Sequence, residues 1–215
     1  MRVNKYIAQA TGLSRRAVDA AIKDRRVSVN GLPASAGQQI AASDIVTLDK
    51  RPITPDVKTV TLILNKPIGY VVSRDGQGSQ TIYDLLPPEY HGLKPVGRLD
   101  KDSSGLLLLT NDGQLAHQLT HPSFQKEKVY EVVLDKPLES KDRSDIESGI
   151  ELEDGVSRLS LSGEGAAWIV TMNEGRNRQI RRTFAARGYT VTKLHRIQFG
   201  PYKLNNLPLE KFTIL

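Results

Sequence analysis

The 215-residue sequence predicts an α+β protein, in which a small N-terminal module precedes a larger domain with a mixed, largely antiparallel β-sheet and flanking helices. Three observations support this fold class. The length exceeds that of one typical domain, about 100–150 residues. Hydrophobic residues make up 39% of the chain, which is enough to bury a core. Beyond residue 59, strand-like runs outnumber helical patterns and often follow one another directly, as antiparallel strands do.

The first 48 residues are predicted to form a helix–helix–hairpin module. A short helical pattern stops at Gly12, because glycine readily adopts the left-handed conformation of a helix end. Ser14 is placed to cap a second helix. The alternating run Val27–Val29, the tight-turn pair Asn30-Gly31 and the run Ile45–Leu48 then predict a strand hairpin.

Residues 49–58 contain two prolines and five charged residues without periodicity, so we expect a linker of limited flexibility there. Residues 59–215 form the predicted second domain. Its strand-like runs are Val60–Leu64, Tyr70–Ser73, Gly105–Thr110, Val129–Leu134, Ala167–Met172 and Tyr189–Val191. Its helical patterns are Asp112–Leu119, Lys141–Ser148 and Arg178–Arg187.

Charge and composition restrict the partner and the compartment. The net charge of +6 favours a polyanionic partner. No apolar run approaches the roughly 20 residues of a membrane span, and no signal-peptide pattern opens the chain. We therefore expect a cytoplasmic protein without membrane contact. The absence of cysteine excludes disulfides and thiolate catalysis.

Basic residues are concentrated in the N-terminal module, where only Asp19 and Asp24 oppose them before the hairpin. Such a cluster favours contact with RNA phosphates, although a solvated helix surface explains it equally well. The candidates for RNA binding are Lys5, Arg15, Arg16, Lys23 and Arg25. The stretch Arg2–Leu48 resembles an S4-type RNA-binding domain, which has an α-L-like fold. This resemblance implies that the second helix and the hairpin bind structured RNA.

Motifs for cofactors and metals are absent from the sequence. Gly76 and Gly78 form a G-x-G without the third glycine or the Gly-Lys-Ser/Thr that nucleotide-binding loops contain. His117 and His121 have the i, i+4 spacing of a metal-binding pair, but Pro122 follows directly and no glutamate stands beside His117. No Gly-x-Ser-x-Gly segment indicates a hydrolase. We expect neither a cofactor nor a metal.

A polar loop that leads into a buried strand carries the strongest functional signal, Gly97-Arg98-Leu99-Asp100. Taken alone, Asp100 would be a turn residue. The longer string Pro95–Thr110, however, closely resembles the catalytic motif of pseudouridine synthases, in the branch of the small-subunit rRNA enzyme and its large-subunit relatives. Further segments match this branch in the expected order: Lys128–Val132, Asn173–Arg182, Val191–Ile197 and Leu207–Leu209.

The resemblance implies that uridine is isomerised to pseudouridine, a reaction that breaks the N1–C1′ bond and rejoins the uracil through C5. No atom is gained or lost, so no cofactor is required. It implies that Asp100 is the essential carboxylate, which either attacks C1′ or takes the 2′ proton. Arg181 is implied as the partner that keeps Asp100 ionised, since a guanidinium can lower a carboxylate pKa by about 1–3 units.

Tyr130 is implied to stack on the uracil and to remove the C5 proton, whereas a strand tyrosine more commonly has a packing role. Leu194 is implied as an apolar wall of the pocket, or it is an ordinary core leucine. Arg98 contacts the nucleotide or braces the loop of Asp100. The residues expected to hold backbone phosphates, or else to present an exposed basic helix face, are Arg176, Arg178 and Arg182. The target base must leave its stack to reach such a pocket.

Two other functions would account for part of the sequence. A non-enzymatic S4-type protein acting in ribosome assembly or translation would explain the charge, but not the matched contexts of Asp100, Tyr130 and Arg181. An S4-linked RNA methyltransferase would need a methyl-donor site that the sequence lacks. The segment Asn177–Arg182 resembles the large-subunit relatives more closely, so we expect 23S rRNA or a pre-ribosomal particle as the partner of a monomeric protein.

Overall fold

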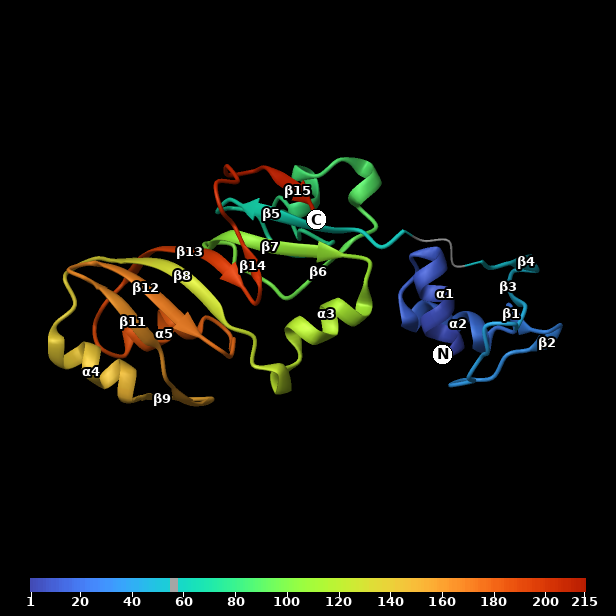
Figure 1. The fold of residues 1–215 in the computed structure, drawn as a ribbon, viewed down its shortest axis with the longest axis horizontal. Helices are drawn as coiled ribbons and strands as arrows, with labels where there is room; N and C mark the ends of the chain where they lie inside the picture. Colours follow the sequence, from blue (N-terminus) through green and yellow to red (C-terminus); the bar gives the residue numbers. More distant parts are fainter. Residues whose placement is uncertain (55–57) are drawn as a thin grey trace. The chain divides into compact units, whose positions relative to one another are not determined.

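The computed structural model describes residues 1–54 and 58–215, apart from the Pro122 side chain, and the chain divides into two units, Met1–Val60 and Thr61–Leu215 (Figure 1). In the first unit, helices α1 (Val3–Thr11) and α2 (Arg15–Lys23) precede a four-stranded sheet. Its strand order is β2 (Leu32–Pro33), β1 (Val27–Val29), β3 (Val46–Leu48) and β4 (Arg51–Pro52). The predicted helix–helix–hairpin module is present.

The helix ends of this unit follow the predicted signals. Gly12 is left-handed (φ 75°) and ends α1, and the Ser14 hydroxyl accepts the Ala17 N–H at 3.1 Å to cap α2. Strand pairing continues beyond the predicted module end at residue 48, because β4 pairs with β3. The N-terminal part of the predicted linker is therefore paired backbone, while residues 55–57 of that linker lie outside the described residues.

The second unit is built on one large mixed sheet. The order of its main path is β11 (Ser160–Glu164), β12 (Ala167–Met172), β8 (Lys128–Leu134), β13 (Val191–Phe199), β7 (Ser104–Thr110), β5 (Thr61–Lys66) and β15 (Phe212–Ile214). β14 (Tyr202–Lys203) pairs with β13, and β6 (Lys94–Pro95) pairs with β7. Neighbouring strands are antiparallel except β13 and β7, which are parallel. The predicted α+β class with a largely antiparallel sheet is confirmed.

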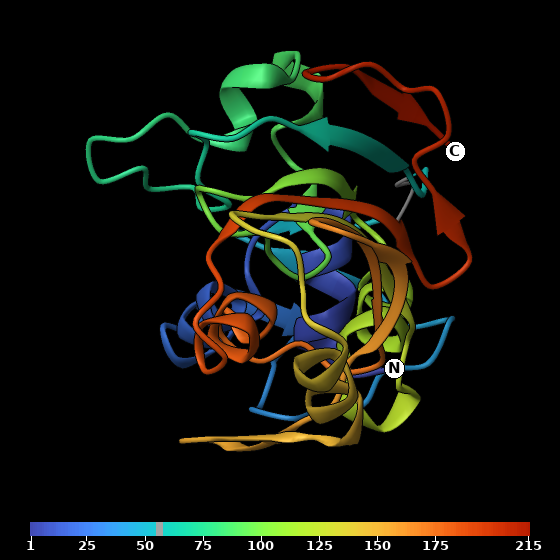
Figure 2. The ribbon, with the colours of Figure 1, turned by 90° about the vertical axis from the view of Figure 1, so that its left-hand side faces the viewer.

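Three helices and a separate hairpin complete this unit. The helices are α3 (Gly113–Thr120), α4 (Ser140–Ser148) and α5 (Gln179–Ala185), and the hairpin pairs β9 (Ile150–Leu152) with β10 (Gly155–Ser157). Short 3-10 turns occur at Ile82–Leu85, Pro88–Tyr90 and Pro122–Phe124. In both ribbon views, α4 and α5 lie below the arch formed by β8 and β13 (Figures 1 and 2). None of the helices in the described residues has the length and apolar character needed to cross a bilayer.

The central strand β7 and its neighbour-but-one β8 differ in how their side chains are buried. Leu106, Leu107, Leu108 and Leu109 of β7 are all fully buried, so side chains on both faces of this central strand are covered. In β8, by contrast, Tyr130, Val132 and Leu134 are buried and alternate with less buried residues. This alternation gives β8 one buried face, which carries Tyr130, and one more exposed face.

Several predicted elements were wrong in extent or absent. Tyr70–Ser73 forms no strand, since it contributes only the isolated bridge between Val71 and Thr81. The predicted strand Tyr189–Val191 is instead the start of the long β13, which begins at Val191. The short hairpin strands between Pro137 and Gly165 were not predicted, because exposed polar residues such as those of β11 carry little hydrophobic periodicity.

Candidate active-site cleft

A cleft of about 1190 Å³ opens in the second unit. Its walls come from segments that are far apart in the sequence: the loop Gly97–Asp100, strands β8 and β13, and the segment Met172–Ile180 that leads into α5. The predicted residues that line it are Arg98, Asp100, Tyr130, Arg176, Arg178 and Leu194. The fold thus brings together most of the residues that the sequence singled out.

The loop that carries Asp100 rests on a buried lysine. Lys66, at the end of β5, is fully buried, and its Nζ donates to the carbonyls of Pro67 (3.0 Å), Asp100 (3.0 Å) and Ser103 (2.7 Å). Burial lowers the pKa of Lys66 to about 8, while the charges of Asp100 and Asp102 oppose this shift. One ammonium therefore holds both ends of the Asp100–Ser103 turn through hydrogen bonds to their carbonyls.

A glycine allows the next strand to approach closely. Gly105 of β7 faces Arg196 of the parallel strand β13, and it has a φ of 107°. A Cβ at this position would lie 2.3 Å from the Arg196 carbonyl oxygen, which no side chain tolerates. The glycine therefore permits the close backbone contact that sets the Asp100 loop beside β13.

Asp100 and its neighbour Asp102 share arginines unequally. The Asp100 carboxylate is 36% exposed and lies 3.7 Å from Arg178 Nη1. Asp102 receives two hydrogen bonds from Arg178, at 2.9 and 2.7 Å. Arg181 Nε lies 3.3 Å from the Asp102 carboxylate, and its Nη2 donates to the Asp102 carbonyl at 2.7 Å. The hydrogen bond from Arg178 holds the pKa of Asp102 below its usual value, against the effect of burial.

The predicted contact between Arg181 and Asp100 was therefore wrong in this structure. The remaining terminal nitrogen of Arg181 donates to the Val191 carbonyl at 2.7 Å, so the side chain ties α5 to β13 and to the loop. The Nη atoms of Arg181 are both engaged by carbonyls and its Nε faces Asp102, so no donor is directed at Asp100. Helix α5 itself begins at Gln179. Its N-cap is Arg178, in a left-handed conformation (φ 47°), and no side chain caps the helix. Asn177, the preceding residue, offers its carbonyl to Arg182 Nε at 2.8 Å.

Tyr130 and Leu194 lie on neighbouring strands at the floor of the cleft. Both side chains are buried to more than nine-tenths, and both line the cavity. Tyr130 of β8 faces Arg196 of β13 in the strand register, and Leu194 faces Val132. Because side chains two residues apart share a sheet face, Leu194 and Arg196 lie on the same side of β13. The predicted stacking and wall roles stay predictions.

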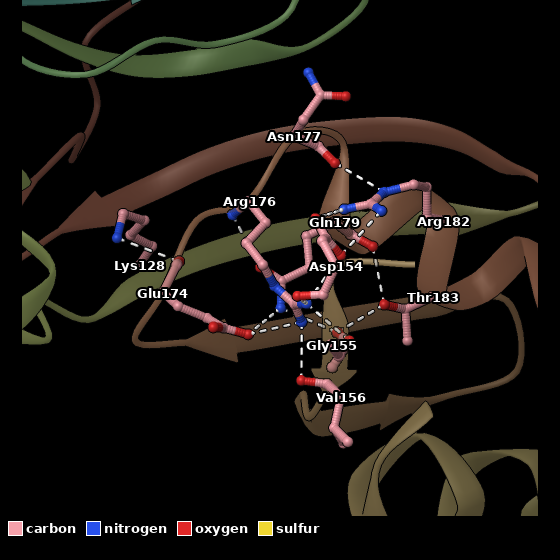
Figure 3. A network of polar contacts seen from close by, with 11 residues as sticks. Lys128, Asp154, Gly155, Val156, Glu174, Arg176, Asn177, Gln179, Arg182 and Thr183 are labelled. Atoms are coloured by element: carbon pink, nitrogen blue, oxygen red, sulfur yellow. Dashed lines mark hydrogen bonds and ion pairs between the residues drawn. The ribbon is translucent and has the colours of Figure 1, made fainter. Parts of the chain in front are cut away.

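Arg176 and Arg182 were expected to hold backbone phosphates or to form an exposed basic helix face. In the structure, however, their guanidinium groups are engaged within the protein. Figure 3 shows both directed at Asp154 in the turn of the β9–β10 hairpin. Arg176 donates to the Asp154, Gly155 and Val156 carbonyls at 2.7–2.9 Å and also to the Asp154 carboxylate. Arg182 donates twice to the same carboxylate, at 3.1 and 2.7 Å. Their donors hold the hairpin against the helix.

A buried polar network supports this contact from inside (Figure 3). The Gln179 amide donates to the Ser157 hydroxyl at 3.0 Å and to the Glu174 carboxylate. Thr183 donates to the same Ser157 hydroxyl at 2.8 Å. Gln179, Ser157 and Thr183 are all buried, and a satisfied buried network rigidifies its surroundings. The segment before α5, which carries Arg178, is therefore anchored on the side away from Asp100.

All but one of the remaining predicted residues are exposed. Arg98 lies on the cleft wall, so contact with the nucleotide and support of the loop both remain open. In the first unit, the Arg15, Arg16, Lys23 and Arg25 side chains are exposed, and Lys5 is partly buried. Arg15 donates to Asn4 at 3.3 Å, and no carboxylate within the described residues forms an ion pair with Arg16. Binding of RNA by these side chains stays a prediction.

Sequence reasoning missed Lys66, Asp154, Lys128 and Arg196 as parts of this site. Lys66 carried a usable signal, because a lysine that ends an apolar strand and precedes proline is unusual in a core position. Asp154 carried none, since its arginine partners lie 22 and 28 residues away.

Comparison with known proteins identifies the family of each unit. A family model described as RNA pseudouridylate synthase matches residues 60–186, and an S4 domain model matches residues 1–55. A protein of Aquifex aeolicus named as an uncharacterized RNA pseudouridine synthase is 36% identical over 225 residues, which cover 100% of this chain and 90% of the relative. The ribosomal large subunit pseudouridine synthase B of Vibrio vulnificus is 38% identical, over 95% of this chain and 68% of its own.

A solved structure extends this likeness to the backbone. It is described as a crystal structure of pseudouridylate synthase and superimposes with a TM-score of 0.72 at 33% identity, covering 100% of this chain and 96% of that one. The chain therefore belongs to the RNA pseudouridylate synthase family, and its first 55 residues form an S4 domain.

Proposed function

We propose that this protein isomerises a uridine of large-subunit ribosomal RNA to pseudouridine, with Asp100 as the catalytic carboxylate. One observation carries the assignment of Asp100. Its carboxylate is accessible in the same cleft as Tyr130 and Leu194, and it is the less strongly paired of the two loop aspartates. An accessible carboxylate whose oxygens accept no hydrogen bond from the neighbouring cation keeps its lone pairs for the substrate.

Asp102 supports this division of roles. It takes the short contacts to Arg178 and Arg181, so the positive charge beside the cleft is balanced without occupying the Asp100 oxygens. During the reaction the N1–C1′ bond breaks, the uracil turns and the C5–C1′ bond forms, while C5 loses a proton and N1 takes one up. The Asp100 carboxylate has access for either attack at C1′ or removal of the 2′ proton, and both routes return it to its starting state.

The proposed substrate rests on the relatives and on charge. The Vibrio vulnificus relative is named for the large ribosomal subunit, and the S4 domain presents exposed arginines that suit an RNA backbone. A non-enzymatic S4 protein would have no use for the cleft and its carboxylate pair. We further propose that the protein acts in the cytoplasm and is a monomer. Sedimentation of the purified chain would test the monomeric state.

Release of tritium from C5-labelled uracil tests the function, because isomerisation must expel that hydrogen. The full chain incubated with C5-tritiated 23S rRNA should release label in proportion to pseudouridine formed. The variant Asp100→Asn should bind the same RNA with unchanged affinity and release none. The proposed substrate would be contradicted if 23S rRNA kept its label after incubation with the unmodified protein, both as free RNA and in pre-ribosomal particles. Release by Asp100→Asn at the normal rate would remove Asp100 from the mechanism.

A further inference from the structure

Two cations share one aromatic ring on the floor of the cleft. Phe199, at the end of β13, is buried, and its ring centroid lies 5.0 Å from the guanidinium carbon of Arg196. The Lys128 ammonium lies 5.3 Å from the same centroid. The strand register pairs Phe199 with Lys128 and Arg196 with Tyr130, and all four line the cleft. Two strands therefore hold two positive charges beside the predicted uracil-contacting tyrosine.

The hydrogen-bonding capacity of Arg196 is incompletely used. This side chain is 2% exposed, and its Nε donates to the Leu106 carbonyl at 2.8 Å. Its Nη2 atom is buried and has no hydrogen-bond partner among the described residues. A buried N–H without a partner is costly, and an unpartnered guanidinium nitrogen more so. In a wall of a cleft, such a group indicates a ligand.

Lys128 is also without a carboxylate contact. Its Nζ donates to the Lys126 and Glu174 carbonyls, at 3.2 and 3.3 Å (Figure 3). The Glu174 carboxylate is instead engaged by Arg176 and Gln179. Across residues 1–54 and 58–215, no carboxylate lies within 4.0 Å of the Lys128 or Arg196 nitrogens. Burial and the charge of Arg196 both lower the pKa of Lys128, whereas Glu174 opposes them.

This arrangement has an uncompensated positive charge. Partly buried cations are normally paired, because desolvation is costly, and two like charges beside one ring add to that cost. Cation–π contact with Phe199 offsets only part of it. An anion bound between the two cations would restore the balance and would take up the free Arg196 N–H. Arginine and lysine together are well suited to a phosphodiester.

We propose that Arg196 and Lys128 form a phosphate subsite that holds a phosphodiester flanking the target uridine. This inference rests on the proposed function. Lys128 is two residues from Tyr130 on the same strand face, so their Cα atoms lie roughly 7 Å apart. That spacing suits a base at the tyrosine and a phosphate of the same nucleotide at the lysine. The phosphate contact predicted for Arg176 and Arg182 is thereby assigned to residues deeper in the cleft.

Uridine 3′,5′-bisphosphate and uridine are the two probes, and calorimetric titration of the full chain measures the affinity for each. The unmodified protein should bind the bisphosphate at least about tenfold more tightly than uridine, since each charge-assisted hydrogen bond contributes on this scale. Lys128→Met should remove most of that preference and leave uridine binding unchanged. Arg196→Lys, which keeps the charge but loses the guanidinium fork, should reduce the preference partially.

Matched controls come from the same domain. Lys136 lies over the Tyr189 ring at 4.7 Å, and Arg143 lies over the Trp168 ring at 5.3 Å, so both repeat the cation-over-ring packing away from the cleft lining. Lys136→Met and Arg143→Gln should keep the full preference for the bisphosphate. An equal loss in these controls, or an equal weakening of uridine and bisphosphate binding by Lys128→Met, would overturn the subsite.

Tritium release separates this proposal from the proposed function. Unmodified protein that releases C5 tritium, combined with a bisphosphate preference that does not depend on Lys128, would refute the subsite and leave the function standing. If the unmodified protein releases no tritium but Lys128→Met abolishes its preference for the bisphosphate, the proposed function would be refuted and the subsite would stand. Circular dichroism of Arg196→Lys shows whether this buried position still folds. If it does not, Lys128→Met alone decides the proposal.

Discussion

Four arginines lie within the seven residues Arg176–Arg182, and they form ion pairs with two different segments of the second unit. Arg178 and Arg181 turn toward the Asp100 loop, where Asp102 is closely paired and Asp100 is left 3.7 Å from its cation. Arg176 and Arg182 turn toward Asp154, where hydrogen bonds from both guanidinium groups occupy the carboxylate. One side retains an underused carboxylate, and the other side does not.

This difference separates the contact that we propose to be reactive from a structural one. A carboxylate whose two oxygens both accept hydrogen bonds positions a chain segment but leaves no acceptor for a substrate. A carboxylate that keeps accessible oxygens beside a cation remains available for chemistry. Residue type alone could not distinguish the two sides, because all four arginines belong to one segment. Perturbing each side separately therefore tests the comparison.

The largest expected effect is at Lys66, which supports the reactive side. Lys66→Met would leave three buried carbonyls without their donor, so the free energy of unfolding of the second unit should fall by about 3 kcal/mol. Trp168, the single tryptophan, lies in this unit, and its fluorescence during urea unfolding reports the change. A matched change at exposed Lys203, Lys203→Met, should leave stability within about 0.5 kcal/mol.

The difference in stability between the unmodified protein and Lys66→Met should change with pH in a defined direction. The pKa of Lys66 is lowered from 10.5 to about 8 on folding, so between these values the unfolded chain binds more protons. Stability of the unmodified protein, relative to Lys66→Met, should therefore rise from about pH 8 to pH 10.5. A relative stability that is flat or falls over this window would show that the ammonium is not desolvated beneath the loop.

Much of this framework could be predicted from the sequence, and the failures have physical causes. Gly12 and Ser14 were identified correctly because helix caps depend on one residue and its immediate neighbours. Asp100 was predicted from its long motif; the structure places it in the cleft, and its catalytic role stays a prediction. The pairing of Arg181 was wrong because Asp102 and the Val191 carbonyl take its nitrogens, and these tertiary contacts follow from no local pattern. Asp154 was missed because its partners are distant in sequence.

The next effect separates the two sides directly. Asp102→Asn removes the charge that balances Arg178 and Arg181, so Arg178 is free to move onto Asp100 and to occupy its reactive oxygens. We expect kcat to fall by about 10²-fold, as for a misplaced catalytic group. Asp154→Asn should instead raise KM severalfold with kcat nearly unchanged, because it loosens a wall without touching the reacting atoms. Equal losses of kcat in both variants would remove the distinction between reactive and structural pairing.

The smallest effect applies the same reasoning to the S4 domain. Arg26 is paired with Asp49 through two hydrogen bonds of 2.7 Å, whereas Arg16 is exposed and forms no ion pair within the described residues. A guanidinium that is already paired must break that contact before it meets a phosphate. Arg16→Gln should therefore lower the salt dependence of RNA binding by about one phosphate contact, and Arg26→Gln should lower it less. Binding of 23S rRNA measured from 50 to 200 mM salt decides this, and identical slopes for the two variants would show that existing ion pairs do not determine which S4 arginines bind RNA.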